Sequence, residues 1–503
     1  MGILAHGYTL LNQFQYHDDV AVPFSVGPTL RVGRWSNYIL GKIFNLFLWS
    51  DTLSMSFFNG IIAIIVISLT AVFIIRILEL KNNFLNCILA ALCTSFPVVT
   101  TALGYRFMSH TYAIGVFLSV LGVYIITNEN SNNSRLKVFI FFATEIFAIG
   151  IYQAVIPVYL SLITFHFVKY FIKNDLSHKE FFMKFTYLAI LSVIPIILYL
   201  TLTLIFRALT GIEFSSYQGF DKLGTGGFLD WSKRFAKTYF MLLVPSKNQI
   251  GNIYLLSTIF FYYVLLIYSI FISLKFLLSL KGTKKFLQYV FMMLVLPLSI
   301  NFIYIMCGVN SFVYTLMEFS LFFMFVYPCM LTEICLERKV SIGKNNIKFI
   351  VIILSVICFI YIYFANMCYV KADYLKSRAI SYFTVLQARI QSTEGYSEKY
   401  PLVFAGESYK KSTESITLTE ELQNIKIFPY MWSEVINSHS YKNFMKFWNG
   451  YSPVIYEIEN ERDLIKLDSE TKNKIKDFTK NMWHYPDDGS IKVFENKIIV
   501  VNF

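Results

Sequence analysis

Residues 57 to 78 read FFNGIIAIIVISLTAVFIIRIL, an apolar run long enough to cross the hydrocarbon core of a bilayer as a single helix. Similar runs recur near 84–103, 111–127, 137–151, 153–172, 185–207, 254–277, 286–306, 313–334 and 347–368. The runs 137–151 and 153–172 are also compatible with one broken helix. A shorter run at 1–15, which contains His6, Asn12 and Gln13, brings the prediction to about eleven spans. The sequence therefore predicts a polytopic α-helical membrane protein.

The composition of the 503-residue chain supports the same class of protein. Hydrophobic residues make up 56% and charged residues 15%, and the mean hydropathy is +0.54, which excludes an ordinary soluble surface. The net charge of +12 is spread over short connectors and forms no stripe, so no nucleic-acid partner is expected. The seven cysteines lie in or beside apolar runs without a CxxC pair, which argues against a zinc site and a disulfide framework.

The distribution of Lys and Arg predicts the orientation, because cytoplasmic loops carry the excess of both. The short connectors 76–83, 128–137, 169–184, 275–285 and 336–348 are rich in them. These connectors are therefore expected inside, with the amino terminus cytoplasmic and the carboxyl terminus outside. The long segments 15–56 and 208–253 become outer loops of a membrane domain that comprises residues 1–369.

Residues 370–503 form a second kind of sequence, in which charges are frequent and long apolar runs stop. Strand-like pieces at 401–405, 454–457, 491–494 and 498–501 alternate with amphipathic helical pieces at 412–424 and 471–482. We expect a small extracytoplasmic α/β domain here. Its Trp432, Trp448 and Trp483 are candidates for stacking on sugar rings, although core packing is the favoured interpretation.

Two adjacent carboxylates, Asp18 and Asp19, follow the first apolar run. Because adjacent carboxylates repel each other, one of them tends to hold a proton more strongly, which suits a general base. The alternative is a solvated helix end. Arg31 and Arg34 lie in the same outer loop, and Arg106 lies in a second outer turn. The planar fork of arginine suits phosphate oxygens, although a lone Arg34 could equally be a helix-end residue that reaches toward water.

Other polar residues are weaker candidates. Tyr105 and His110 flank Arg106 and are predicted to contribute to substrate binding, although His110 could simply start a helix. Glu145 and Gln153 lie within predicted spans, where polar groups face a cavity or a structural partner. Glu318 also lies within a predicted span, and we expect it to have a structural role. No set of metal ligands can be assigned, and a divalent cation between the aspartates and a phosphate is left open. Residues 228–243 mix apolar and basic residues with a helical period, which predicts a helix at the membrane interface.

Several segments follow one another in a recognisable order: YHDD at 16–19, VGRW at 32–35, GYRFMSHTYAIG at 104–115, FAIGIYQAVIPVYLSL at 147–162 and YQGFDKLG at 217–224. In this order the chain resembles the bacterial serotype-converting O-antigen glucosyltransferases of the Gtr type, membrane enzymes related to the GT-C group. The resemblance covers residues 10 to about 230. It implies a GT-C-like membrane domain in the bacterial cytoplasmic (inner) membrane, and a base in the first outer loop, at Asp18 or Asp19.

The resemblance also implies the reaction. Glucose would move from an undecaprenyl-phosphate carrier to a lipid-linked glycan or surface polysaccharide on the outer face. The residues suggest the same chemistry: a carboxylate takes the proton of the acceptor hydroxyl, while Arg34 and Arg106 neutralise the leaving phosphate, with inversion at the sugar carbon. The donor enters from the membrane lipid, and no nucleotide fold is needed. A polysaccharide polymerase and a lipid-linked sugar flippase or transporter are the alternatives, although no convincing internal repeat supports a transporter.

Overall fold

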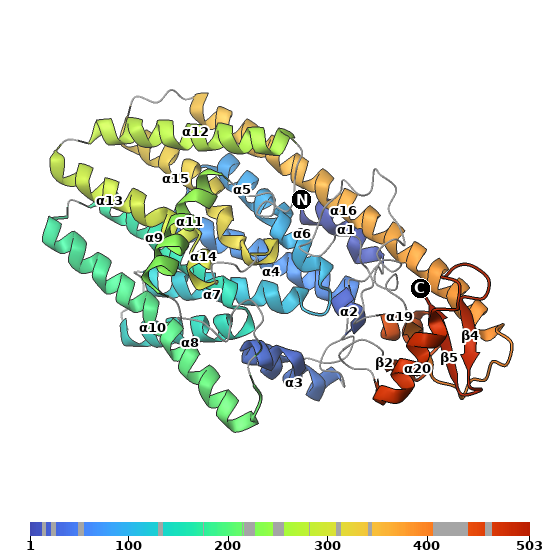
Figure 1. Ribbon diagram of the computed structural model, residues 1–503. Helices are drawn as coiled ribbons and strands as arrows, with labels where there is room; N and C mark the ends of the chain where they lie inside the picture. Colours follow the sequence, from blue (N-terminus) through green and yellow to red (C-terminus); the bar gives the residue numbers. More distant parts are fainter. Residues whose placement is uncertain are drawn as a thin grey trace. The chain divides into compact units, whose positions relative to one another are not determined.

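Figure 1 shows a computed structural model of the full chain. The structure describes residues 1–12, 17–21, 27–48, 55–128, 134–174, 176–213, 215, 227–244, 256–280, 282–307, 313–340, 345–405, 441–457 and 465–503. The chain divides into two compact units. The first comprises Met1–Leu11 and Phe24–Asn366, and the second comprises Asn12–Pro23 and Met367–Phe503.

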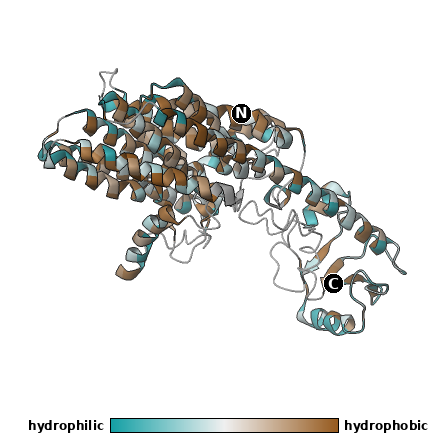
Figure 2. Cartoon of the chain, turned by 90° about the horizontal axis from the view of Figure 1, so that it is seen from above, coloured by the Kyte–Doolittle hydropathy of each residue, from teal (hydrophilic) through white to brown (hydrophobic). Residues whose placement is uncertain are grey.

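The first unit is a bundle of apolar helices. Nine helices in the described part of the chain are long and apolar enough to cross a membrane: Ser56–Ile77, Asn83–Gly104, Ser109–Thr127, Gln153–Lys173, His178–Thr210, Ile259–Ser279, Thr283–Ile300, Phe319–Glu337 and Asn345–Gln391. Apolar residues run along these helices in Figure 2, and many of them are exposed on the bundle, such as Ile65 on α4 and Ile197 on α10. An apolar exterior of this kind suits lipid. The protein is therefore a polytopic helical membrane protein.

The first unit contains α1 (Gly2–Leu11), α3 (Trp35–Leu48), α4 (Ser56–Ile77), α5 (Asn83–Ser95), α6 (Pro97–Gly104), α7 (Ser109–Thr127), α8 (Ser134–Ile151), α9 (Ile156–Lys173), α10 (His178–Thr210), α11 (Phe228–Leu243), α12 (Leu256–Ser279), α13 (Thr283–Ile300), α14 (Ile303–Met306) and α15 (Phe323–Glu337). It also contains the first part of α16 (Asn345–Gln391), whose residues from Met367 onward belong to the second unit. Short 3₁₀ helices are η1 (Gly27–Val32), η2 (Gln153–Val155), η4 (Thr315–Met317) and η5 (Phe319–Phe322).

Two of the eleven predicted spans, 1–15 and 137–151, are not among the nine helices given above. Helix α1 has 10 residues, which rise only about 15 Å, whereas the hydrocarbon core is about 30 Å thick. Helix α8 has 18 residues but includes Arg135, Lys137 and Glu145. It is separated from α9 by Tyr152, whose extended backbone (φ −156°, ψ 116°) interrupts the helix. The predicted number of eleven spans therefore stays a prediction.

Close helix packing in the bundle depends on small residues of α7, which packs against both α4 and α8. A Cβ atom at Gly122 would lie 2.5 Å from the Thr144 hydroxyl and 2.6 Å from a Glu145 carboxylate oxygen, both on α8. A Cβ atom at Gly115, two turns away on the same face, would lie 3.2 Å from Ile151. In lipid, where apolar burial gives little drive for association, such close contact is a main source of helix pairing.

The second unit contains a five-stranded sheet in the order β3-β2-β1-β5-β4. The strands are β1 (Leu402–Ala405), β2 (Ile455–Glu457), β3 (Ile465–Lys466), β4 (Ile491–Phe494) and β5 (Ile498–Asn502). Strand β1 pairs in parallel with β2 and β5, β2 pairs in parallel with β3, and β4 pairs antiparallel to β5. Four of these strands lie where the sequence predicts them. The predicted helical piece 412–424 and Trp432 lie outside the described residues.

Both faces of this sheet are covered, because successive residues of β1 and β5 point to opposite sides. Leu402, Phe404, Ile499 and Val501 join one apolar cluster with the last part of α16 and with α19 (Tyr441–Trp448). Val403, Ala405, Ile498 and Val500 join a second cluster, with Ile475 and Phe478 of α20 (Ser469–Thr479). Trp448 stacks on Phe444 at 5.1 Å within the first cluster, whereas Trp483 is 68% exposed.

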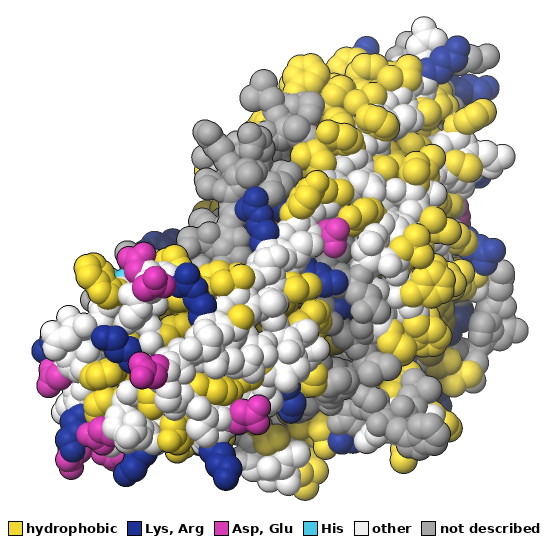
Figure 3. Space-filling view, turned by 90° about the vertical axis from the view of Figure 1, so that its right-hand side faces the viewer, with side chains coloured by type: hydrophobic (Ala, Val, Ile, Leu, Met, Phe, Trp, Pro, Cys, Tyr) yellow, Lys and Arg dark blue, Asp and Glu magenta, His cyan; other side chains and the backbone are white. Residues whose placement is uncertain are grey.

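Charges of both signs are mixed on the surface shown in Figure 3.

Candidate active site

The segment Gly33, Arg34 and Trp35 connects η1 to α3, and its backbone is fixed by contacts with two other elements. Gly33 takes φ +73°, which glycine adopts without strain, and its carbonyl accepts a 3.0 Å hydrogen bond from the Tyr199 hydroxyl of α10. The Gln153 side-chain amide donates to the Val32 carbonyl at 2.6 Å and to the Tyr199 hydroxyl at 2.8 Å. The loop is therefore held at two successive residues, Val32 and Gly33.

The Arg34 side chain lies over an aromatic ring. Its guanidinium carbon is 4.5 Å from the centre of the Tyr152 ring, and Tyr152 in turn packs edge-on against Tyr112 of α7 at 5.5 Å. A guanidinium over a ring is attracted by its π-electrons and keeps the hydrogen-bonding edge of its plane available. Tyr152 stands at the break between α8 and α9, so the interruption of the helix is what brings this ring to Arg34.

Trp35 forms the other side of the same segment. Its ring stacks on Phe206 of α10, with centroids 5.2 Å apart and planes 9° from parallel. Gly150 of α8 makes room for this packing, since a Cβ atom there would overlap Ser36 and approach the Trp35 ring to 2.9 Å. A small pocket lies beside it. Its lining is mainly apolar with a few polar groups: Leu30, Gly33, Trp35, Thr203, Phe206, Arg207, Thr210 and Ile212.

Arg106 follows α6 and is 2% exposed. Its guanidinium donates to the Ser56 hydroxyl at the start of α4, and its carbonyl accepts a 3.0 Å hydrogen bond from the Asn59 side chain. Tyr105 beside it is buried. The His110 ring lies 5.6 Å from the Phe44 ring of α3. Arg31 is exposed, and its carbonyl accepts from the Ser215 backbone amide at 2.8 Å.

Of the two residues predicted to line a cavity, Gln153 reaches the Arg34 loop and Glu145 does not line the pocket described above. Glu145 is fully buried on α8, against Gly122 and beside Ser119 of α7. Asp18 and Asp19 lie on α2 (His17–Ala21), which belongs to the second unit together with the sheet. Asp18 is half-buried and Asp19 is 0% exposed. Their roles, like that of Glu145, stay predictions.

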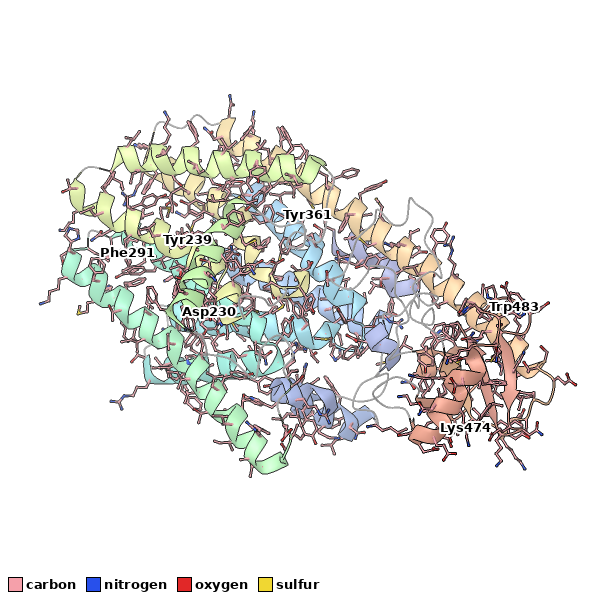
Figure 4. All side chains as sticks on the ribbon, in the orientation of Figure 1. Asp230, Tyr239, Phe291, Tyr361, Lys474 and Trp483 are labelled. Atoms are coloured by element: carbon pink, nitrogen blue, oxygen red, sulfur yellow. The ribbon has the colours of Figure 1, made fainter. Side chains whose placement is uncertain are left out.

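The interfacial helix predicted at 228–243 coincides with α11, whose ends are near the labelled Asp230 and Tyr239 in Figure 4. Its apolar residues Phe228, Leu229 and Phe240 are exposed. Arg234 is 6% exposed and donates to the Ile305 carbonyl at 3.3 Å. The helix therefore exposes apolar side chains and buries Arg234, while Lys233 is exposed.

Sequence reasoning missed three residues that shape this site: Tyr152, Tyr199 and Phe206. Each is an aromatic residue inside an apolar run, and in a sequence such residues look like ordinary lipid-facing or core side chains. The signal for Tyr152 was its place between two runs that could have been one helix. Among the residues that the structure describes, no group of three or more His, Cys, Asp or Glu side chains could hold a metal ion.

The fold and the site together define a polytopic membrane protein. Within its helix bundle, Arg34 lies over the Tyr152 ring and Arg106 is buried beside the start of α4. The model of the family named glucosyl transferase GtrII matches residues 7–333, about two thirds of the chain. The chain belongs to this family and is a membrane glycosyltransferase of O-antigen modification. No curated protein and no solved structure is similar enough to the chain to count as a match.

Proposed function

We propose that the protein transfers a hexose, which we take to be glucose, from a polyprenyl-phosphate carrier to a surface polysaccharide or lipid-linked glycan on the outer face of the bacterial inner membrane. The observation that carries this proposal is the Arg34 guanidinium, held 4.5 Å from the Tyr152 ring centre within the segment that the family model matches. A fixed, planar cation of this kind suits the oxygens of a lipid phosphate. The membrane setting suits a donor that carries a polyprenyl chain.

The proposed reaction is a single displacement. The acceptor hydroxyl oxygen forms a bond to the anomeric carbon while the bond from that carbon to the phosphate oxygen breaks. The hydroxyl proton passes to Asp18 or Asp19, and the bonding electrons leave with the polyprenyl phosphate. Arg34 and Arg106 neutralise the charge that develops on this leaving group. A single displacement inverts the configuration of the anomeric carbon.

The test uses the full chain reconstituted in lipid vesicles with polyprenyl-phosphate glucose and an acceptor glycan, with mass analysis of the glycan. We expect the glycan to gain single hexose units. Asn substitution at the catalytic aspartate should lower turnover by about 10²- to 10⁴-fold, the usual contribution of a general base. Asp477→Asn is the matched control, because Asp477 is an exposed residue of α20 paired with Lys480 at 2.8 Å.

Three results would contradict the proposal. Growth of the glycan by whole repeat units would indicate a polymerase. Movement of the lipid-linked sugar across the vesicle membrane without transfer would indicate a flippase. Wild-type turnover in both Asp18→Asn and Asp19→Asn would remove the aspartates from the mechanism.

A further inference from the structure

Two charged side chains are deeply buried in the second unit, and they carry opposite signs. Asp19 on α2 is 0% exposed, and Lys371 on α16 is 1% exposed. Among the described residues of this unit, no other Asp, Glu, Lys or Arg side chain is classed as buried. A single charge removed from water is strongly unfavourable, so buried charges are found with a partner of opposite sign. Asp19 and Lys371 carry the opposite signs that such a pair requires.

Their neighbours place them beside the same apolar cluster. Val20, the residue after Asp19, is fully buried in the cluster that contains Leu375, Ala379 and Phe383 of α16. These three residues repeat every four positions and so lie along one face of the helix. Lys371 stands four residues before Leu375 and continues that face by one turn. The buried Asp19 carboxylate is thus adjacent in sequence to Val20 of this cluster. The buried Lys371 ammonium lies one helical turn before Leu375 of the same cluster.

We propose that Lys371 is the counter-ion of Asp19, and that it positions α2 so that Asp18 acts as the general base. The proposal rests on the proposed function for the role of Asp18, whereas the pairing itself does not. Successive helical residues point about 100° apart, so a helix that directs Asp19 into the unit directs Asp18 elsewhere. Asp18 is half-buried, and its carboxylate is therefore the one of the two that an acceptor hydroxyl can reach.

This pairing also removes the conflict between two adjacent carboxylates. Without a cation, the two carboxylates would repel each other. With Lys371 neutralising Asp19, we assign to Asp18 the uptake of the acceptor's proton. Lys371 acts here as a positioning residue, because it reaches the reaction only through Asp19.

The pairing is tested by a double-mutant cycle on the full chain, measured as the melting temperature in detergent. Asp19→Asn and Lys371→Met should each lower it, because each leaves the other charge buried alone. The double variant Asp19→Asn/Lys371→Met should melt no lower than the worse single variant. Losses that simply add would overturn the pairing. If a single variant yields no folded protein, recovery of folded protein in the double variant supports the pairing, and failure of the double overturns it.

The role in catalysis is tested by kinetics on the same variants. Lys371→Met should lower kcat by about tenfold or more while the KM for the donor changes little, and Lys371→Arg should restore most of kcat. Lys446→Met is the control, since Lys446 is an exposed lysine of α19. Asp18→Asn should lower kcat more than Asp19→Asn does, by the range expected for a lost base. The reverse order, or full activity in Lys371→Met, would overturn the assignment.

The two tests fail separately. If the wild-type chain transfers no sugar from a polyprenyl-phosphate donor, the proposed function fails, and the melting-temperature cycle still decides the pairing. If transfer occurs and the melting-temperature losses add, the proposed function stands and Lys371 loses its role.

Discussion

The Arg34 guanidinium lies over the ring of Tyr152, two residues that are more than one hundred positions apart in the chain. Tyr152 interrupts the helical run between α8 and α9, and Gln153 next to it fastens the backbone at Val32. One helix break therefore supplies both the ring beneath the cation and the amide that holds its loop. The cation is fixed before any substrate arrives, as preorganised stabilisation of a leaving group requires.

Replacing Arg34 tests this arrangement. Arg34→Gln should lower kcat by about 10²-fold, the usual loss when one group that stabilises developing charge is removed. Arg34→Lys should recover only part of kcat, because an ammonium lacks the planar fork and the stacking on Tyr152. Turnover is measured in the vesicle assay. Arg135→Gln, at an exposed arginine of α8, serves as the control. Equal activity in the Lys variant and the wild type would show that only the charge matters.

Tyr199→Phe tests the loop that carries Arg34. The Tyr199 hydroxyl donates to Gly33 and accepts from Gln153, and the residue is 2% exposed. Its removal leaves buried polar groups short of a partner, which should cost about 1–3 kcal/mol of stability. We also expect kcat to fall because the Arg34 loop becomes less well held. The melting temperature and turnover measure the two effects. Tyr187→Phe on the same helix, at a tyrosine that is 57% exposed, should change neither.

Gly122→Val tests the contact between α7 and α8. The added Cβ atom would lie 2.6 Å from a Glu145 oxygen, so the helices must move apart. Forced overpacking of this kind costs about 1–3 kcal/mol. The loss is measured as a lower melting temperature in detergent. Gly7→Ala is a suitable control, since its Cβ atom would meet Ile3 at an ordinary 3.7 Å. A wild-type melting temperature in Gly122→Val would contradict the close packing.

Glu79 gives a pH prediction in the connector between α4 and α5. A hydrogen bond from Lys173, and the charge of Lys169 at 3.3 Å, lower the pKa of the Glu79 carboxyl below its ordinary value of 4.5. A pKa that is lower in the folded state stabilises the fold above pH 4.5, and this stabilisation is lost as the pH falls through the folded-state pKa. Because Glu79 is 59% exposed, the effect should be at most about 1 kcal/mol.

The measurement is the melting temperature between pH 6 and about pH 3. The wild type should lose more stability over this range than Glu79→Gln, which has no carboxyl group to protonate. A Glu394→Gln variant, at an exposed residue after α16, should follow the wild type. Identical pH profiles for the wild type and Glu79→Gln would contradict the ion pairs around Glu79.

The sequence predicts several helix bounds correctly. Where a predicted bound differs from the structure, the cause is a signal at the end of that helix. The predicted helix 228–243 coincides with α11, because its amphipathic period is strong. The predicted span 185–207 is longer in the structure, His178–Thr210, because Ser177 and Glu180 form a capping box and Gly211 ends the helix in the left-handed conformation. Hydropathy alone does not register such end signals.

The span predicted at 347–368 continues as α16 to Gln391. Beyond the apolar run its stability comes from a stripe of apolar residues every three to four positions, which packs onto the sheet of the second unit: Leu375, Ala379, Phe383, Leu386 and Ile390. This period was present in the sequence. Mean hydropathy does not reveal it, because averaging over a span cancels the alternation of apolar and polar faces.

The sequence alone determined the class of protein and most of its candidate spans, because the need for apolar residues in lipid is a property of each segment by itself. It also singled out Arg34 as a candidate phosphate-binding residue. Only the tertiary structure decided what Arg34 meets. Tyr152, Gln153 and Tyr199 reach its loop from elements far along the chain, through packing of aromatic rings and hydrogen bonds that are directional and non-local. Composition does not encode such pairings, because they arise only when the helices are packed in three dimensions.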